Sequence, residues 1–329
     1  MPPGAVGALD GGGHTMAEGT AKMASRVSAP AVEARKGHGA PLVMVTAYDA
    51  PSARIVDRAG VDMILVGDTL AMVVLGYDDT LQVTTEDMAH HVGAVARTSP
   101  RALVVGDLPW LSYHVSTADT VRNAASLIRA GAGAVKLEGG RKRLPAVQAI
   151  LDAEIPVMGH LGLTPQSVHA LGGFRVQGKE LEAARAIVDD AIALAEAGCF
   201  AIVLECVPDA VARLVTDTVP VPTIGIGAGR HCDGQVLVFH DLLGLEDRLK
   251  PKFVRRYAEL GADATEAVAR FADDVRAGRF PSSKETYHAA DTFPDELKLE
   301  GPDRAGGKTP PAASPSAAGD NEAQEPAPA

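Results

Sequence analysis

Cysteine, aromatic residues and positive charge are all scarce in this chain of 329 residues. The three cysteines, Cys199, Cys206 and Cys232, are odd in number and match no zinc-binding spacing, so a reducing cytoplasm is the expected location. Aromatic residues make up 4% of the sequence, which argues against a surface that stacks nucleobases. The net charge of −11 argues against nucleic acid or an anionic membrane as the main partner, because both need a basic surface.

Long apolar runs are absent as well. No stretch approaches the roughly 20 apolar residues that are needed to cross a bilayer. The N-terminal segment "MPPGAVGALDGGGHTMAEGT" has no continuous apolar core behind a basic front, so it is a poor signal peptide. Hydrophobic residues nevertheless make up 46% of the sequence, which is typical of a soluble globular protein with a sizeable core.

The two ends of the chain differ in composition from the rest. Residues 1–25 are rich in glycine and alanine, and residues 301–329 consist mainly of proline, alanine, glycine and acids. Such segments bury too little apolar surface to offset the entropy that is lost on ordering. We therefore predict a disordered extension over 1–25, an ordered domain over 26–290 and a disordered tail over 291–329.

Between the ends, short β-branched runs alternate with amphipathic helical stretches. The runs are almost continuously apolar, which is typical of parallel strands that are buried on both faces. Eight strands are predicted, at residues 42–48, 62–68, 102–107, 133–138, 155–160, 200–205, 221–227 and 235–240.

Helix signals separate these strands. Asp49 is placed to cap a short helix that ends at Gly60. A second helical pattern runs from Ser116 to Gly131, and a third ends before Gly198. Eight strands that alternate with helices favour a (β/α)₈ barrel, the TIM barrel.

An open doubly wound sheet is the alternative to the barrel. Its usual mark is a glycine-rich fingerprint after the first strand, but here that strand ends in "TAYDAPS". After the eighth strand, a further helical pair is predicted at about 251–259 and 263–277, to pack either on the barrel or on another subunit.

Charged residues stand at the ends of several predicted strands. In a barrel of this kind the active site lies at the C-terminal ends of the strands. The second strand ends in Asp68 and the third in Asp107, while the sixth ends in Glu205. The fourth strand ends in Lys136 and Glu138, which lie two residues apart and therefore share a face.

Carboxylates packed within a few Å cannot all stay ionised unless a cation neutralises them or some of them bind protons. A hard divalent ion such as Mg²⁺ resolves this conflict, since it prefers oxygen ligands. Each acid also has a simpler explanation. Asp68 would cap a helix, although the next helix is predicted only near Thr84. Glu138 would pair with Lys136, and Glu205 would pair with an arginine.

Three other features leave their roles open. His160, at the end of the fifth strand, either contacts a substrate or is a hydrogen-bonded core histidine. The stretch "GIGAG" (225–229) is not a dinucleotide fingerprint, and it either binds phosphate or lets a flat ligand or another backbone approach closely. His90 and His91 lie in a predicted helix and need no special role.

Several long motifs, which follow one another in the order typical of one family, carry a resemblance to that family. They are "VTAYDAPSARI…GVDMILVGDTLAMVVLGYDDTLQVTTEDMAHH", "DLPWLSY", "AVKLEGG", "MGHLGLTPQS", "VLECVP" and "IGIGAG…CDGQVLVFHDLLG". Over about residues 28–290 the chain resembles the ketopantoate hydroxymethyltransferase (3-methyl-2-oxobutanoate hydroxymethyltransferase) family.

The resemblance implies a Mg²⁺-dependent (β/α)₈ barrel of the phosphoenolpyruvate/pyruvate-binding type. It implies transfer of a hydroxymethyl group from 5,10-methylenetetrahydrofolate to 3-methyl-2-oxobutanoate, which gives 2-dehydropantoate and tetrahydrofolate. This reaction is the first step of pantothenate and coenzyme A biosynthesis. The implied partners are the small 2-oxoacid and the folate, and the implied assembly is a homodecamer.

The resemblance also assigns roles to residues by their places in the motifs. Asp68, Asp107 and Glu138 match the metal-binding acids of the family. Four residues match positions that bind the 2-oxoacid: Asp68, Thr69, Asp107 and Lys136.

Glu205 matches the proton acceptor of the family. Thr69 stands where many members have serine, which keeps the hydroxyl, and Ala71 stands where glycine is usual, which narrows the pocket slightly. A related lyase or mutase is an alternative, but the "KKCGH"-like loop common in such lyases is missing from the sequence. A non-catalytic binding barrel is another alternative, and loss of the acids would be its sign.

Overall fold

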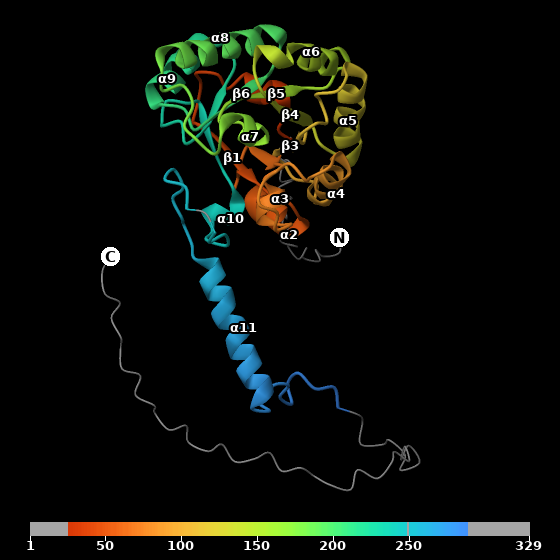
Figure 1. The fold of residues 1–329 in the computed structure, drawn as a ribbon. Coiled ribbons are helices and arrows are strands. Elements are labelled where there is room, and N and C mark those ends of the chain that lie inside the picture. The colour runs from red at the N-terminus through yellow and green to blue at the C-terminus, as the bar shows by residue number, and fades with distance from the viewer. Residues whose placement is uncertain (1–25, 249, 289–329) are drawn as a thin grey trace, which may run out of the picture. The chain divides into compact units, whose positions relative to one another are not determined.

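The computed structural model describes residues 26–248 and 250–288 and contains a closed barrel of eight parallel strands (Figure 1). The strands are β1 (Leu42–Thr46), β2 (Met63–Val66), β3 (Leu103–Asp107), β4 (Ala134–Glu138), β5 (Val157–Gly162), β6 (Ala201–Glu205), β7 (Thr223–Ile226) and β8 (Gly234–Leu237). Each strand pairs with the next one in the chain, and β8 pairs with β1, which closes the barrel. The predicted barrel is confirmed, and the doubly wound alternative is wrong. The predicted tails, 1–25 and 291–329, lie outside the described residues.

Helices surround the barrel (Figure 1). The longer ones are α2 (Ala50–Arg58), α4 (Thr85–Ala96), α5 (Thr117–Ala130), α6 (Leu144–Asp152), α8 (Leu181–Ala197) and α9 (Asp209–Thr218). The shorter ones are α1 (Ala29–Glu33), α3 (Leu70–Val73), α7 (Val168–Leu171) and α10 (Phe239–Leu242), with 3₁₀ turns η1 (Arg141–Arg143) and η2 (Pro165–Ser167). No helix in the described part of the chain is long and apolar enough to cross a bilayer.

The predicted helix boundaries follow from their caps. The Asp49 side chain accepts a hydrogen bond from the Ser52 N–H at 2.7 Å, which starts α2. Ser116 caps α5 in the same way, and Gly131 ends that helix in the left-handed conformation. Gly198 ends α8 likewise. These helix ends can be predicted from the sequence because each cap uses only residues within one helical turn.

The helix predicted at about 251–259 is wrong. A backbone donor near the end of this segment is used by a distant residue: the Tyr257 N–H donates to the Leu242 carbonyl. A donor that is bonded elsewhere cannot serve the i→i−4 ladder of a helix. The second helix of the predicted pair is present as α11 (Leu260–Arg276).

Two apolar layers hold the barrel together. One fills its interior with side chains such as Met44, Met63, Leu65 and Met158. The other lies between the strands and the surrounding helices. Because both faces of most strands are buried, the strands carry the continuous apolar runs seen in the sequence, and only their C-terminal ends are left for polar groups.

Gly162 at the end of β5 offers a test of how tightly two strand ends pack. Its φ is +94°, and an added Cβ would lie 2.2 Å from the Glu205 carbonyl oxygen. We expect Gly162→Ala to lower the free energy of unfolding by more than the 1–3 kcal/mol that left-handed strain alone costs, because the clash adds to the strain. Chemical denaturation measures this loss.

Gly60→Ala is the matched control, since Gly60 has a φ of +85° but nothing lies within 4 Å of its added Cβ. We expect Gly60→Ala to show the strain alone. An equal loss in the two variants would mean that the close approach at Glu205 contributes nothing.

Candidate active site

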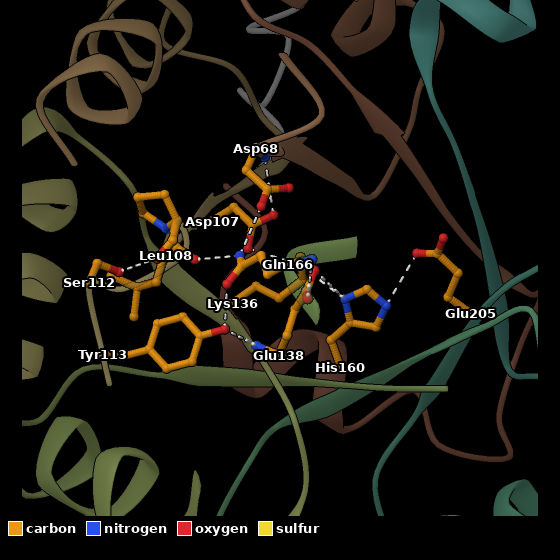
Figure 2. Close-up of polar contacts among 11 residues, drawn as sticks. Asp68, Asp107, Leu108, Ser112, Tyr113, Lys136, Glu138, His160, Gln166 and Glu205 are labelled. Carbon is orange, nitrogen blue, oxygen red and sulfur yellow. Dashed lines mark hydrogen bonds and ion pairs between the residues drawn. The ribbon is translucent and has the colours of Figure 1, made fainter. Parts of the chain in front are cut away.

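A cavity of about 50 Å³ lies at the C-terminal end of the barrel, where the polar strand ends meet. Figure 2 shows polar side chains that line it, from Asp68 to Glu205. Its lining includes every site residue predicted from the sequence, together with His160: Asp68, Thr69, Asp107, Lys136, Glu138, His160 and Glu205. The barrel therefore brings together side chains that come from five strand ends. The remaining lining is largely apolar, which keeps the local dielectric low.

An ion pair lies at the centre of this cavity. The Nζ atom of Lys136 is 2.8 Å from Oδ1 of Asp107, and both side chains are buried. The two residues are direct partners in the β3–β4 ladder, so the backbone register places them side by side. The backbone N–H of Asp68 donates to the other oxygen of Asp107 at 3.2 Å. The simple pairing of Glu138 with Lys136, one alternative from the sequence, is therefore not what the structure shows.

His160 lies between Lys136 and Glu205 (Figure 2). The Nζ atom of Lys136 is 3.2 Å from Nδ1 of His160, and Nε2 of His160 is 3.2 Å from Oε2 of Glu205. Burial, and then the positive charge of Lys136, lowers the pKa of His160, so the imidazole is neutral. A protonated Lys136 donates to Nδ1, which leaves the ring proton on Nε2, facing Glu205. That N–H is not well aligned with the carboxylate, so the contact is close without being a full hydrogen bond.

Two residues that had no role in the sequence interpretation connect the acids. The side chain of Gln166 donates to Oδ2 of Asp68 at 2.8 Å, and its backbone N–H donates to Oε2 of Glu138 at 3.0 Å. The hydroxyl of Tyr113 donates to Oε1 of Gln166 at 2.6 Å. Both residues lie in motifs that carried the resemblance, "GHLGLTPQS" and "DLPWLSY", but nothing in their spacing indicates that they meet.

When ionised, the acids of the site carry more negative charge than its lysine can balance. Burial, reinforced by Asp107, raises the pKa of Asp68 to about 8. Burial, reinforced by Asp68, raises the pKa of Glu138 well above its ordinary value. Burial by itself lowers the pKa of Lys136, but the carboxylates, led by Asp107, outweigh it and raise that pKa. Each shift has the same origin, which is the concentration of acids in a dry cavity.

These residues fit a hard divalent cation in two respects. Their donors are oxygens, and Oε1 of Glu138 is buried without a hydrogen-bond partner. Within residues 26–248 and 250–288, no three His, Cys, Asp or Glu side chains form a ready-made metal-binding group. That result is compatible with Mg²⁺, which commonly takes one or two carboxylates and completes its shell with water and substrate oxygens.

Asp68 does not cap a helix. A short helix that the sequence did not indicate, α3, begins directly after it, but its cap residue Thr69 makes no capping hydrogen bond through its side chain. The carboxylate of Asp68 instead accepts from Gln166. Asp68 and Thr69 therefore both face the cavity, and the next long helix begins at Thr85, close to where it was predicted.

Glu205 occupies the edge of the cavity, and its side chain is 17% exposed, whereas those of Asp107, Lys136 and Glu138 are nearly inaccessible. The next residue, Cys206, has a φ of 47°, which is strained for a residue with a side chain. Two backbone hydrogen bonds hold it, from its N–H to the Ile226 carbonyl and from the Gln177 N–H to its own carbonyl. The chain therefore turns sharply immediately after Glu205.

A larger hollow of about 430 Å³ lies elsewhere, lined by Pro41, Gly227, Gly229, Arg230, Cys232, Gln235 and Phe253. Its lining in the described chain contains no carboxylate and no histidine. The smaller cavity, which holds the ionisable cluster, is therefore the better candidate for chemistry.

The chain is similar to known proteins in sequence and in fold. A sequence model of the family described as ketopantoate hydroxymethyltransferase matches residues 26–283. The chain is 58% identical over 264 residues to the 3-methyl-2-oxobutanoate hydroxymethyltransferase of Moorella thermoacetica, and the match covers 80% of this chain and 98% of that protein. The chain belongs to the ketopantoate hydroxymethyltransferase family. A second relative of the same name, from Syntrophomonas wolfei, is 54% identical, with 83% of this chain and 99% of that protein covered.

Several solved structures have a fold similar to that of this chain. A phosphoenolpyruvate phosphomutase from Streptomyces platensis has a TM-score of 0.51 and 16% identity, covering 76% of this chain and 88% of that chain. A 2,3-dimethylmalate lyase, described as a member of the PEP mutase/isocitrate lyase superfamily, has a TM-score of 0.51 and 17% identity, covering 78% of this chain and 88% of that chain. At these identities the similarity shows the fold alone, which is the predicted (β/α)₈ barrel.

The raised pKa of Asp68 predicts a pH-dependent stability. In the unfolded chain this pKa is near 3.8, whereas burial raises it to about 8 in the folded protein. The folded state therefore binds the proton more tightly, and the extra stability that is present below about pH 4 is lost as the pH rises towards about 8. We expect Asp68→Asn to lose less stability than the parent over this range, in chelator-treated buffer, by chemical denaturation. Parallel curves for the two proteins would contradict the raised pKa.

Proposed function

We propose that this protein transfers a hydroxymethyl group from 5,10-methylenetetrahydrofolate to 3-methyl-2-oxobutanoate, giving 2-dehydropantoate and tetrahydrofolate. This is the first step of pantothenate biosynthesis. One observation carries the proposal: in a chain of this family, the acids, the lysine and the threonine that match its motifs all line one cavity at the C-terminal end of the barrel.

The proposed metal is Mg²⁺, with Asp68 and Asp107 as ligands and Glu138 as the third acid near it. Bound there, the cation would act as a Lewis acid on the keto group of the 2-oxoacid. The excess of buried carboxylates supports this assignment, because burial and then mutual repulsion raise the pKa values of Asp68 and Glu138, and a divalent cation would offset both effects.

The 2-oxoacid would be bound by Asp68, Thr69, Asp107 and Lys136. The ammonium of Lys136 is fixed by Asp107 and remains charged, so it can stabilise negative charge that develops on the substrate oxygens. The hydroxyl of Thr69 is not engaged in capping α3, which leaves it able to donate to the substrate.

Glu205 would be the general base that removes the proton from C3 of the 2-oxoacid. It lines the same cavity, and the neutral ring of His160 presents its N–H towards the carboxylate. A positioned base of this kind typically contributes about 10²–10⁴-fold to the rate. The resulting enolate would then form a C–C bond to the one-carbon unit of the folate, while water supplies the hydroxyl oxygen and the bonds from that carbon to the folate nitrogens break, releasing tetrahydrofolate.

Family membership supports two further parts of the proposal. We propose a homodecamer as the assembly and the cytoplasm as the location. The second is in keeping with three cysteines that are all free and buried.

The decisive experiment supplies 3-methyl-2-oxobutanoate, 5,10-methylenetetrahydrofolate and Mg²⁺ and measures 2-dehydropantoate by mass spectrometry. We expect product with the parent protein, and none when a chelator replaces the metal. Failure of a well-folded protein to form product would overturn the proposed function.

The role of Glu205 is tested by hydrogen exchange at C3 in deuterium oxide, followed by NMR. We expect Glu205→Gln to slow this exchange by about 10²–10⁴-fold, because the amide cannot accept the proton. Calorimetry should show that the variant still binds Mg²⁺. Glu196→Gln, an exposed glutamate on α8, is the control and should exchange normally. Near-normal exchange in Glu205→Gln would remove Glu205 from the role of base.

A further inference from the structure

Gln166 touches two of the three acids through different atoms (Figure 2). It lies in the turn η2 and is 5% exposed. Its backbone N–H donates to Oε2 of Glu138, 28 positions away in the chain, and its side-chain Nε2 donates to Oδ2 of Asp68, 98 positions away. A single residue therefore bonds carboxylates that come from the ends of two non-adjacent strands.

The orientation of the Gln166 amide is determined by its other partners. Nε2 also donates to the Leu108 carbonyl at 2.9 Å, so both of its hydrogens are used. The hydroxyl of Tyr113 accepts from the Glu138 N–H at 3.2 Å, and it donates its own proton to Oε1 of Gln166. If the amide were flipped, Nε2 would face a hydroxyl and Oε1 would face a carbonyl and a carboxylate. The hydrogen bonds therefore permit one orientation.

This arrangement decides which carboxylate oxygens remain available. Gln166 uses Oδ2 of Asp68 and Oε2 of Glu138. Oε1 of Glu138 is then left buried with no hydrogen-bond partner. A buried carboxylate oxygen without a donor is costly, and a cation is the kind of group that compensates it.

We propose that Gln166, oriented by Tyr113, is a positioning residue that presents the carboxylates of Asp68 and Glu138 to a divalent cation. The inference rests on the proposed function for the identity of that cation. Residues that orient metal ligands in this way typically change metal affinity or activity by about 10–100-fold when they are replaced.

The test is Mg²⁺ binding to the protein without substrate, measured by titration calorimetry. Gln166→Met keeps the length of the side chain but removes the donor to Asp68, and we expect it to bind Mg²⁺ about 10–100-fold more weakly. Gln148→Met is the matched control, since Gln148 makes the same kind of bond, at 2.8 Å, to Asp152 on the exposed face of α6. Equal Mg²⁺ affinity in the parent and Gln166→Met would overturn the proposal.

Tyr113→Phe provides a second variant, and its effect in the parent background alone decides the matter if Gln166→Met does not fold by circular dichroism. We expect it to weaken Mg²⁺ binding in the parent, and by a smaller factor in the Gln166→Met background, because Tyr113 acts through the amide that is no longer there. Unchanged binding in Tyr113→Phe, or the same factor in both backgrounds, would contradict the role given to Tyr113.

Failure of this inference is distinguishable from failure of the proposed function. A parent protein that forms 2-dehydropantoate, with normal Mg²⁺ binding in Gln166→Met, overturns only the role of Gln166. A parent that forms no product, but whose Mg²⁺ binding depends on Gln166, overturns the proposed reaction and supports the positioning role.

Discussion

The site depends on how the barrel holds three buried carboxylates beside a single lysine. Charges in a dry cavity are stable only when each oxygen is bonded or a counter-charge lies close by. The donors around Asp68, Asp107 and Glu138 meet this need in part: Lys136, two backbone N–H groups and the Gln166 amide. These donors leave Oε1 of Glu138 buried without a hydrogen-bond partner, and this is the physical reason to expect a cation. A fully neutralised site would have no need of one.

The strand ladder sets the order of the side chains around the cavity. Asp107 is the direct partner of Lys136, Glu138 is the partner of His160, and Gly162 is the partner of Glu205. Each pair lies further along its strands than the pair before it, so the polar ends follow the shear of the barrel. The backbone register therefore determines the relative positions of Lys136, His160 and Glu205. A shift in register of one residue would turn these side chains out of the cavity.

The strands and the acids at their ends could be predicted because both are local signals: an apolar run and the residue that follows it. Gln166 and Tyr113 could not, since their hydrogen bonds join segments whose approach only the closed barrel determines. The role of His160 was open for the same reason. The error at 251–259 is of the opposite kind. A helix-like pattern is present there, but the Tyr257 N–H forms a tertiary hydrogen bond to the Leu242 carbonyl instead.

The unequal exposure of the acids divides the cavity into a dry side and a wet side. Asp107, Lys136 and Glu138 are sealed from solvent, while the carboxylate of Glu205 reaches the rim. With Glu205 as the base, a proton taken from the substrate would arrive on a carboxylate that is partly exposed to solvent. The negative charge on the substrate would then be stabilised on the buried side of the cavity, near Lys136, and the proton would be exchanged on the exposed side, at Glu205. Release of the proton to solvent and binding of the metal would thus depend on different residues.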